Sequence, residues 1–311
     1  MKSIIVPAKD ANIKIGKYLQ TVYPGLSYGT LMKAFRKRDI KVNGVRVEKD
    51  YTVKPGDKLE IYITDDLLSG SPGKPRQGYG EYFSVVYEDE NILLANKNQG
   101  VPVHPDRESS QNTLIEQVRE YLREKNEHHE KNGSFQPSLC HRLDRNTGGL
   151  VIIAKNQASY SAILDKLKSR EIKRYYQCLV KGILKNEEAV LKAYLWKDAK
   201  KSRVFVSGEK TPGAREIITH YKVVGYDPAS DASRLDVELL TGRTHQIRAH
   251  LAFIGHPVIG DGKYGSNAVN RAFGLKYQAL WAYKLKFAFA KDGAPLNYLD
   301  GKEFTVEPRF G

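Results

Sequence analysis

The sequence predicts an α+β protein, in which a small N-terminal α+β domain precedes a larger domain with a mixed, largely antiparallel central sheet and flanking helices. Its 311 residues exceed the length of one average domain. Several strand patterns follow one another directly, which is typical of α+β proteins rather than of strict βαβ alternation. A segment rich in Gly, Pro and Ser carries no hydrophobic period and indicates a linker. We therefore expect domains over residues 1–64 and 82–311, joined by a linker over 65–81.

The N-terminal domain is expected to contain two helices followed by short strands. Helical patterns cover residues 15–23 and 28–38, and in the second one Lys33, Arg36 and Lys37 can point away from an apolar face. Polar and apolar residues alternate over residues 41–63, as in short strands, and two turns that contain Gly interrupt this pattern. Between positions 12 and 62, eleven Lys or Arg against five Asp or Glu give a net charge of +6.

The larger domain is expected to mix buried strands with amphipathic helices. Strand patterns of alternating or continuous apolar residues occur at 82–89, 92–97, 150–155, 175–180, 233–240 and 279–289. Helical patterns occur at 113–125, 157–170 and 244–255. Residues 126–136 are polar and irregular and predict a surface loop.

The composition predicts a soluble partner of a polyanion. Fifty Lys and Arg against 36 Asp and Glu give a net charge of +14, which favours nucleic acid as a partner. Cys140 and Cys178 are too few for a disulfide framework, and no CxxC pair is present. No signal peptide and no run of 18 apolar residues can be found. We therefore expect a reduced, cytoplasmic monomer without a membrane segment.

The densest group of chemically active side chains lies in CHRLDRNTGGLVIIAKN, residues 140–156. It places His141, Arg142, Asp144 and Arg145 in one short loop before a buried strand. The glycine pair that closes the loop can let the backbone approach a ligand closely. Opposite charges nearby favour the ionised form of Asp144. A capped turn with solvated salt bridges would give the same pattern.

A second polar group surrounds the start of the helix predicted over residues 244–255. Thr241 can cap this helix, and Arg243, His245 and Arg248 lie near its start, where backbone donors favour an anion. These residues predict a phosphate site, although an exposed basic helix would look the same. His245 and His250 lack the Glu of the HExxH pattern, so we expect no zinc site.

Two more segments contain residue types that can bind or stack on a ligand. GHPVIGDGKY resembles a phosphate loop, but Asp261 stands where such a loop needs Lys, so we expect no nucleotide site there. Tyr175 and Tyr176 begin a strand after a basic segment. Either one can be a buried structural tyrosine or an aromatic ring that stacks on an extruded base.

These clusters resemble the RluA-type pseudouridine synthase family. The similarity runs, in the family's order, through HRLDRNTGGLVIIAK, REIKRYYQCLVKG and TGRTHQIRAHLAFIGHPVIGDGKYG. It extends over most of residues 82–304. The N-terminal domain is similar to the small RNA-binding module shared with ribosomal protein S4.

The resemblance implies the pseudouridine synthase fold and the isomerisation of uridine in structured RNA by base flipping. It makes Asp144 the essential aspartate, Tyr176 the residue that packs on the target uracil, and Arg243 the partner of the carboxylate. It implies no cofactor and no metal. The side chains expected to contact RNA are Arg142, Arg145, His141, His245, Arg248, Lys33, Arg36 and Lys37.

The sequence leaves the RNA substrate open. Large-subunit ribosomal RNA is the preferred substrate, and transfer RNA is the alternative within the same enzyme class. A catalytically silent ribosome-assembly factor would need the same RNA-binding module, but the intact Asp144, Tyr176 and Arg243 argue against it. A DNA-binding regulator lacks a recognisable reading helix. Whether Asp144 attacks the sugar, attacks the base or removes a proton is also open.

Overall fold

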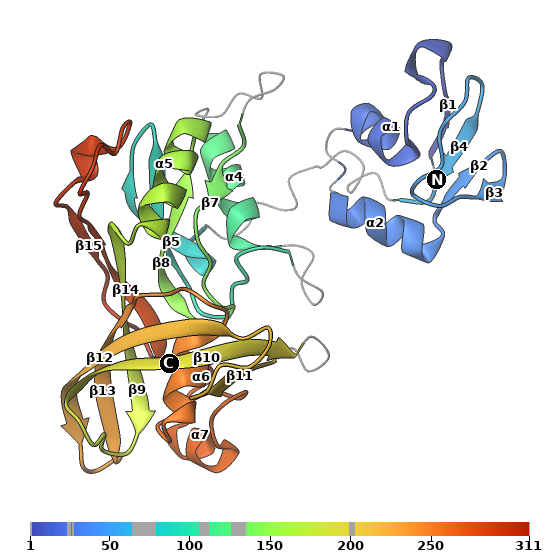
Figure 1. Ribbon diagram of the computed structural model, residues 1–311. Coiled ribbons are helices and arrows are strands. Elements are labelled where there is room, and N and C mark those ends of the chain that lie inside the picture. The colour runs from blue at the N-terminus through green and yellow to red at the C-terminus, as the bar shows by residue number, and fades with distance from the viewer. Residues whose placement is uncertain are drawn as a thin grey trace. The chain divides into compact units, whose positions relative to one another are not determined.

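The computed structural model divides the chain into two compact units, Met1–Gly78 and Tyr79–Gly311 (Figure 1). The residues that it describes are 2–23, 26, 28–63, 79–105, 112–125, 135–198 and 203–310. The division falls inside the segment predicted as a linker. Most of that segment, and most of the loop predicted over 126–136, lies outside the described residues.

The smaller unit is a four-stranded antiparallel sheet with two helices. The sheet order is β1 (Lys2–Ile5), β4 (Lys58–Ile61), β2 (Ile40–Val42) and β3 (Val45–Arg46). Helices α1 (Ile15–Val22) and α2 (Tyr28–Lys37) share one apolar core with the sheet. Leu31 and Phe35 of α2 are buried in that core, whereas Arg36 and Lys37 are exposed. The side chain of Lys33 lies outside the described part of the structure.

The larger unit is built on one sheet of eleven strands. The path of hydrogen-bonded neighbours is β11-β10-β12-β13-β9-β14-β8-β6-β5, with β15 beside β14 and β7 beside β8. All neighbouring pairs are antiparallel except β14 and β8. This confirms the predicted mixed, largely antiparallel sheet. In chain order the strands are β5 (Phe83–Glu88), β6 (Ile92–Lys97), β7 (Ser138–Leu139), β8 (Gly148–Ala154), β9 (Ile172–Lys181), β10 (Glu188–Asp198), β11 (Arg203–Ser207), β12 (Arg215–Asp227), β13 (Ala232–Leu239), β14 (Leu280–Phe287) and β15 (Glu303–Thr305).

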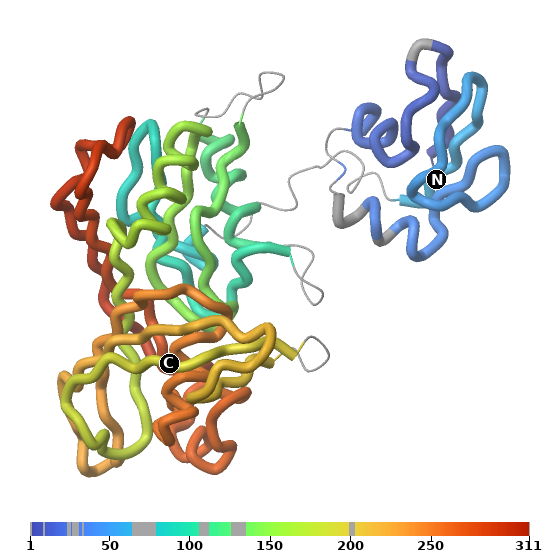
Figure 2. Tube along the Cα trace, viewed as in Figure 1, coloured from blue at the N-terminus to red at the C-terminus, as the bar shows by residue number. Residues whose placement is uncertain are grey.

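Helices flank the two halves of this sheet (Figure 1). Helices α4 (Leu114–Glu124) and α5 (Gln157–Lys168) lie with β5, β6 and β8, and α6 (Gln246–Phe253) and α7 (Asn267–Phe273) lie with β10 to β13. Helix α4 starts where it does because Thr113 and Glu116 form a reciprocal capping box. The chain then returns to β5, where Phe304 packs on Tyr87 with 5.0 Å between the ring centroids. In Figure 2 the red C-terminal segment runs beside the blue-green tube of β5.

The glycine pair of the first motif serves the sheet rather than a ligand. Gly149 has a φ of 112°, and a Cβ there would overlap the backbone of Ala282 in β14. A Cβ on Gly148 would overlap the ring of Trp281. The two glycines therefore let β8 run beside β14, and this close approach fixes the loop that precedes β8.

Candidate active site

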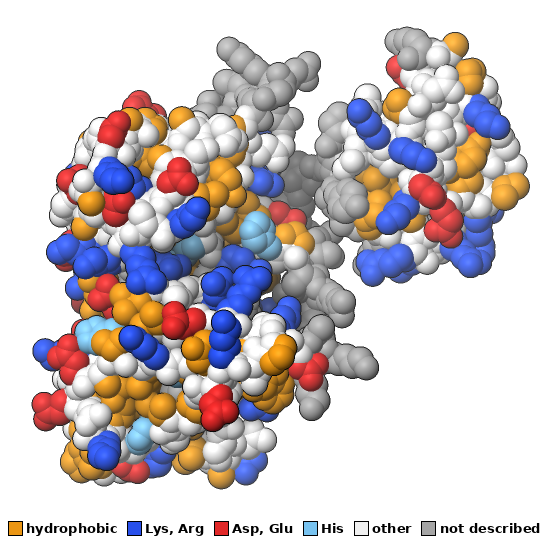
Figure 3. All heavy atoms as spheres, viewed as in Figure 1, with side chains coloured by type: hydrophobic (Ala, Val, Ile, Leu, Met, Phe, Trp, Pro, Cys, Tyr) orange, Lys and Arg blue, Asp and Glu red, His pale blue; other side chains and the backbone are white. Residues whose placement is uncertain are grey.

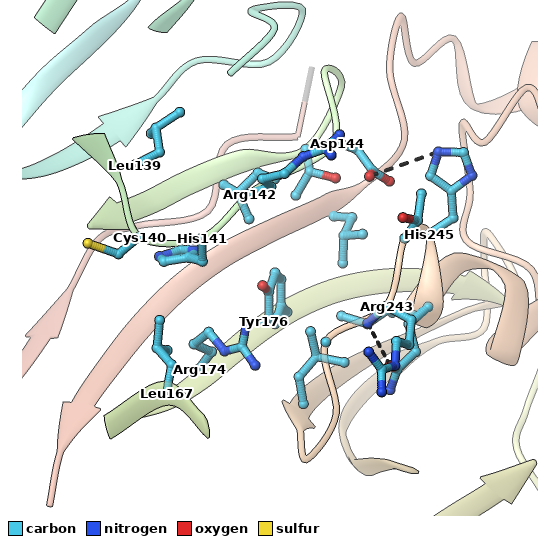
Figure 4. A pocket seen from close by; sticks show the side chains of 18 of the residues that line it. Leu139, Cys140, His141, Arg142, Asp144, Leu167, Arg174, Tyr176, Arg243 and His245 are labelled. Carbon is cyan, nitrogen blue, oxygen red and sulfur yellow. Dashed lines mark hydrogen bonds and ion pairs between the residues drawn. The ribbon is translucent and has the colours of Figure 1, made fainter. Parts of the chain in front are cut away.

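The candidate site lies where the loop of residues 140–147, strand β9 and the start of α6 meet. Two cavities, of about 530 Å³ and about 820 Å³, open there. Both are lined by Asp144, His245 and Arg248. In Figure 4, Asp144 and His245 point toward one another, while Arg243 lies apart from this pair.

The loop that carries Asp144 is anchored from the end of β6. Lys97 is 0% exposed, and its Nζ donates to the carbonyl oxygens of Asn98, Val101 and Arg145, each at 2.9 Å. Gln99 Nε2 donates to the carbonyl oxygen of Asn146 at 3.0 Å. Burial lowers the pKa of Lys97 to about 7, and the charge of Asp144 opposes this shift. Two successive loop carbonyls are thus fixed by neighbouring side chains.

Asp144 is held by a chain of charged groups. Arg248 Nη1 donates to Asp144 Oδ2 at 2.7 Å. The same guanidinium donates from Nε and Nη2 to the two oxygens of Asp261, at 2.7 and 2.9 Å. The Arg248 side chain is 8% exposed and that of Asp261 is 0% exposed. This bidentate pair orients Arg248, which in turn orients Asp144.

The prediction that Arg243 pairs with Asp144 was wrong. The guanidinium that contacts the carboxylate is that of Arg248, not that of Arg243. Helix α6 begins only at Gln246, so Arg243 lies before it, exposed at the rim of the smaller cavity. Thr241 also does not cap the helix: its hydroxyl donates to Gln246 Oε1 at 2.9 Å, and the N-cap position is His245.

Strand β9 separates the two tyrosines because successive side chains of a strand point to opposite faces. Tyr176 is 4% exposed and lines the smaller cavity. Tyr175 lies on the other face, where Lys284 Nζ is 4.3 Å from its ring centroid. Burial raises the pKa of Tyr176, so its phenol is neutral.

Comparison with known proteins places this arrangement in a family. A family model described as RNA pseudouridylate synthase matches residues 91–253. The uncharacterized RNA pseudouridine synthase YhcT of Bacillus subtilis is 32% identical over 80% of this chain and 76% of its own length. YlyB of the same organism, with the same description, is 27% identical over 92% of this chain and 89% of its own length.

The chain belongs to the RNA pseudouridylate synthase family. This confirms the resemblance to RluA-type enzymes, and it makes the chain an RNA pseudouridine synthase, an isomerase. The fold agrees with a solved structure, human RNA pseudouridylate synthase domain containing 1, at a TM-score of 0.56 and 24% identity over 70% of this chain and 83% of that one.

Lys and Arg side chains gather in a band across the catalytic unit of this pseudouridine synthase (Figure 3). Of the residues predicted to bind RNA, Arg142 is exposed and lines both cavities, and half-buried Arg145 lines the larger one. Other cations that line a cavity are Lys168, Arg174, Arg203, Arg243 and Lys263. Such a band suits a phosphate backbone.

His141, which was predicted to contact RNA, lines the smaller cavity as an uncharged ring. Its Nε2 accepts a hydrogen bond from the Ile152 backbone N–H at 3.2 Å, so Nδ1 carries the proton of the neutral ring. Burial, together with the charge of Arg174, lowers the pKa of His141 to about 3. The imidazole therefore packs under the loop as a neutral group.

Sequence reasoning missed four residues of the site: Lys97, Arg174, Asp261 and Tyr264. Asp261 lies in GHPVIGDGKY, the segment that resembles a phosphate loop but lacks its Lys. Its carboxylate instead accepts the backbone N–H groups of Lys263 and Tyr264, at 2.8 and 3.1 Å, besides binding Arg248. Burial alone would raise the pKa of Asp261, but these hydrogen bonds and the Arg248 charge lower it overall. An acid between the glycines of a turn was the available signal in the sequence.

Within the described ranges, no group of three or more His, Cys, Asp or Glu side chains could hold a metal ion. No helix in the same ranges has both the length and the apolar composition needed to cross a membrane.

Proposed function

We propose that this pseudouridine synthase isomerises uridines of large-subunit ribosomal RNA and that Asp144 is its catalytic carboxylate. The observation that carries the proposal is the position of Asp144. It lies where two cavities meet, one of its oxygens is held by Arg248 at 2.7 Å, and it is 24% exposed in its side chain. An anchored but accessible carboxylate is suited to act as a nucleophile or a base.

The smaller cavity is suited to a flipped nucleotide. Extrusion of a base from a stacked strand costs a few kcal/mol, which aromatic contacts in the pocket offset. We place the target uracil against the ring of Tyr176, with its ribose near Asp144. The N1–C1′ bond breaks, the base turns, and a C5–C1′ bond forms. The C5 proton leaves while N1 gains one, so the reaction conserves all atoms and needs no redox partner.

Arg243 has a different place in this proposal from the one the sequence suggested. It lines the cavity of Tyr176 and is exposed, and its backbone N–H donates to Gln246 Oε1 at 3.0 Å. We assign its guanidinium to a phosphate beside the flipped nucleotide. Arg142 at the junction of the two cavities provides a second phosphate contact.

The smaller unit is assigned to RNA binding outside the active site. Arg36 and Lys37 are exposed in the last turn of α2, next to Arg38. Replacing Arg36 and Lys37 by Gln in the full chain should remove about two phosphate contacts, so the slope of log affinity against log salt should fall by about two. Turnover at saturating RNA should stay unchanged. An unchanged salt slope would refute the proposal that this face of the smaller unit binds RNA.

The decisive experiment maps pseudouridine in all cellular RNA, with wild-type protein and with Asp144→Asn. Sites in large-subunit ribosomal RNA should appear only with the wild type. Asp227→Asn, at the exposed end of β12, is the matched control and should behave as the wild type. Sites confined to transfer RNA would refute the substrate assignment, and sites that persist with Asp144→Asn would refute the role of the carboxylate.

A further inference from the structure

His245 occupies an unusual backbone position beside Asp144. It is the N-cap of α6, with φ 54° and ψ 19°, in the left-handed region that non-glycine residues rarely adopt. Residues held in this region cluster at functional sites, because surrounding contacts must stabilise them. Its Nδ1 lies 2.9 Å from Tyr264 Oη, and its Nε2 lies 3.9 Å from Asp144 Oδ1. The sequence predicted only a contact with RNA at this position.

The hydrogen bonds of Tyr264 determine which ring nitrogen of His245 carries a proton. The backbone N–H of Val204 donates to Tyr264 Oη at 3.0 Å. A phenol that accepts one hydrogen bond has one proton left to donate. We assign this proton to the contact with His245 Nδ1, 2.9 Å away. Nδ1 is then unprotonated, and Nε2 carries the hydrogen that faces Asp144.

We propose that His245, locked as the neutral Nε2–H tautomer by Tyr264, positions the Asp144 carboxylate by donating to Oδ1. The inference rests on the proposed catalytic role of Asp144. At 3.9 Å the contact is longer than a hydrogen bond, and we expect it to shorten when RNA binds, as catalytic hydrogen bonds often do. With Arg248 on Oδ2, a second donor on Oδ1 fixes the plane of the carboxylate.

A neutral donor suits this place better than a second cation. Another full positive charge would weaken the carboxylate as a nucleophile or base, whereas a neutral N–H orients it at smaller electrostatic cost. Burial lowers the pKa of His245 to about 4, against the pull of Asp144. The ring is therefore uncharged at neutral pH. The charged groups around it are Asp144, Arg248, Lys263 and Asp261.

The tautomer can be read directly by NMR. In full-length protein labelled with ¹⁵N-histidine, long-range proton–nitrogen spectra at pH 7 should show His245 with Nδ1 unprotonated. His245→Gln assigns the signal by its loss. Two histidines are internal controls with the opposite tautomer: Nε2 of His141 accepts a backbone N–H, and Nδ1 of His256 lies 3.0 Å from the carbonyl oxygen of Lys181. A protonated Nδ1 on His245 would overturn the proposal.

A hydroxyl deletion tests the lock. Tyr264→Phe keeps the ring that lies 5.3 Å from the Arg248 guanidinium but removes the donor to Nδ1. We expect the other His245 tautomer to appear and kcat to fall about two- to tenfold with little change in KM, the range of one hydrogen bond. Tyr221→Phe is the matched control. The Tyr221 hydroxyl lies outside the site and donates to the carbonyl oxygen of Asn186 at 3.2 Å. This variant should leave the tautomer and kcat unchanged.

Side-chain replacement at position 245 separates donation from packing. His245→Gln ends in an N–H donor that cannot titrate, so it should retain more activity than His245→Ala. Equal activity of the two variants, or an unchanged kcat in Tyr264→Phe, would refute the positioning role. If the wild type forms no pseudouridine in any RNA, the proposed function and the positioning role fail together. The spectra would still decide the tautomer.

Discussion

Replacing Arg248 and Arg243 separately tests which arginine supports the carboxylate. Arg248→Ala removes the bidentate contacts at 2.7 and 2.9 Å and leaves Asp261, which is 0% exposed, without its counter-charge. Breaking such a buried pair typically costs about 3–5 kcal/mol of unfolding free energy. Arg243 is exposed, so Arg243→Ala should change stability by no more than about 0.5 kcal/mol.

The two variants should also differ in the kind of activity that they lose. Arg248→Ala removes a charge-assisted hydrogen bond to Asp144, worth about 1.5–3 kcal/mol, so kcat should fall by about ten- to a hundredfold. Arg243→Ala should mainly raise KM, since its proposed partner is a phosphate. Urea unfolding and single-turnover pseudouridine formation on one RNA measure both effects.

A double variant separates stability from chemistry. Adding Asp261→Asn to Arg248→Ala removes the stranded buried charge, so part of the lost stability should return while kcat stays low. The reasoning fails if Arg243→Ala lowers kcat more than Arg248→Ala does. It also fails if the free energy of unfolding is the same for Arg248→Ala and the wild type.

Three further predictions follow from other buried groups. Tyr176→Ala should abolish turnover while Tyr175→Ala retains it, and the reverse result in a pseudouridine assay would place the stacking ring one residue earlier. The pKa of Lys97 lies near 7 in the folded state and about 10.5 in the unfolded one. Unfolding free energy should therefore rise above pH 7 by up to about 1.4 kcal/mol per pH unit, a slope that urea titrations of Lys97→Met should lack. Burial lowers the pKa of His250 to about 4, so its contribution to stability is complete above about pH 6.5 and is lost as the pH falls toward 4. His250→Gln should flatten that acid slope by about one proton.

The sequence predicted the elements whose residues are buried on both sides. Strands β6 and β8 each contain a run of four or more apolar residues and are buried along their whole length, and both were located within two residues. Strands β10 and β12 were not predicted. Charged and apolar residues are interspersed along them, and β10 is buried mainly at two central positions. Their pattern is set by cross-strand pairing over most of their length, which local periodicity does not reveal.

The site could be predicted as a set of motifs but not as a set of contacts. Asp144 and Tyr176 lie in short distinctive segments, and the structure brings both to one cavity. The choice between Arg243 and Arg248 depended on where α6 begins, and helix boundaries are the least certain part of a sequence prediction. In the sequence, Lys97 looks like the polar end of a strand. Its role could not be predicted, because its three acceptors come from a turn and a loop up to 48 positions away. The role of Asp261 could not be predicted from the sequence, because it depends on the contact with Arg248, which only the structure shows.

The order of the central strands has a consequence for synthesis on the ribosome. Strand β14 pairs with β8 on one side and with β9 on the other, so it joins the loop of Asp144 to the strand of Tyr176. Asp144 and Tyr176 are both made more than a hundred positions before the first residue of β14. The growing polypeptide therefore contains every motif of the enzyme before the site can assemble. Until β14 is made, the edges of β8 and β9 that pair with it stay unpaired. A nascent chain stalled before residue 280 should form no pseudouridine and should be prone to aggregate.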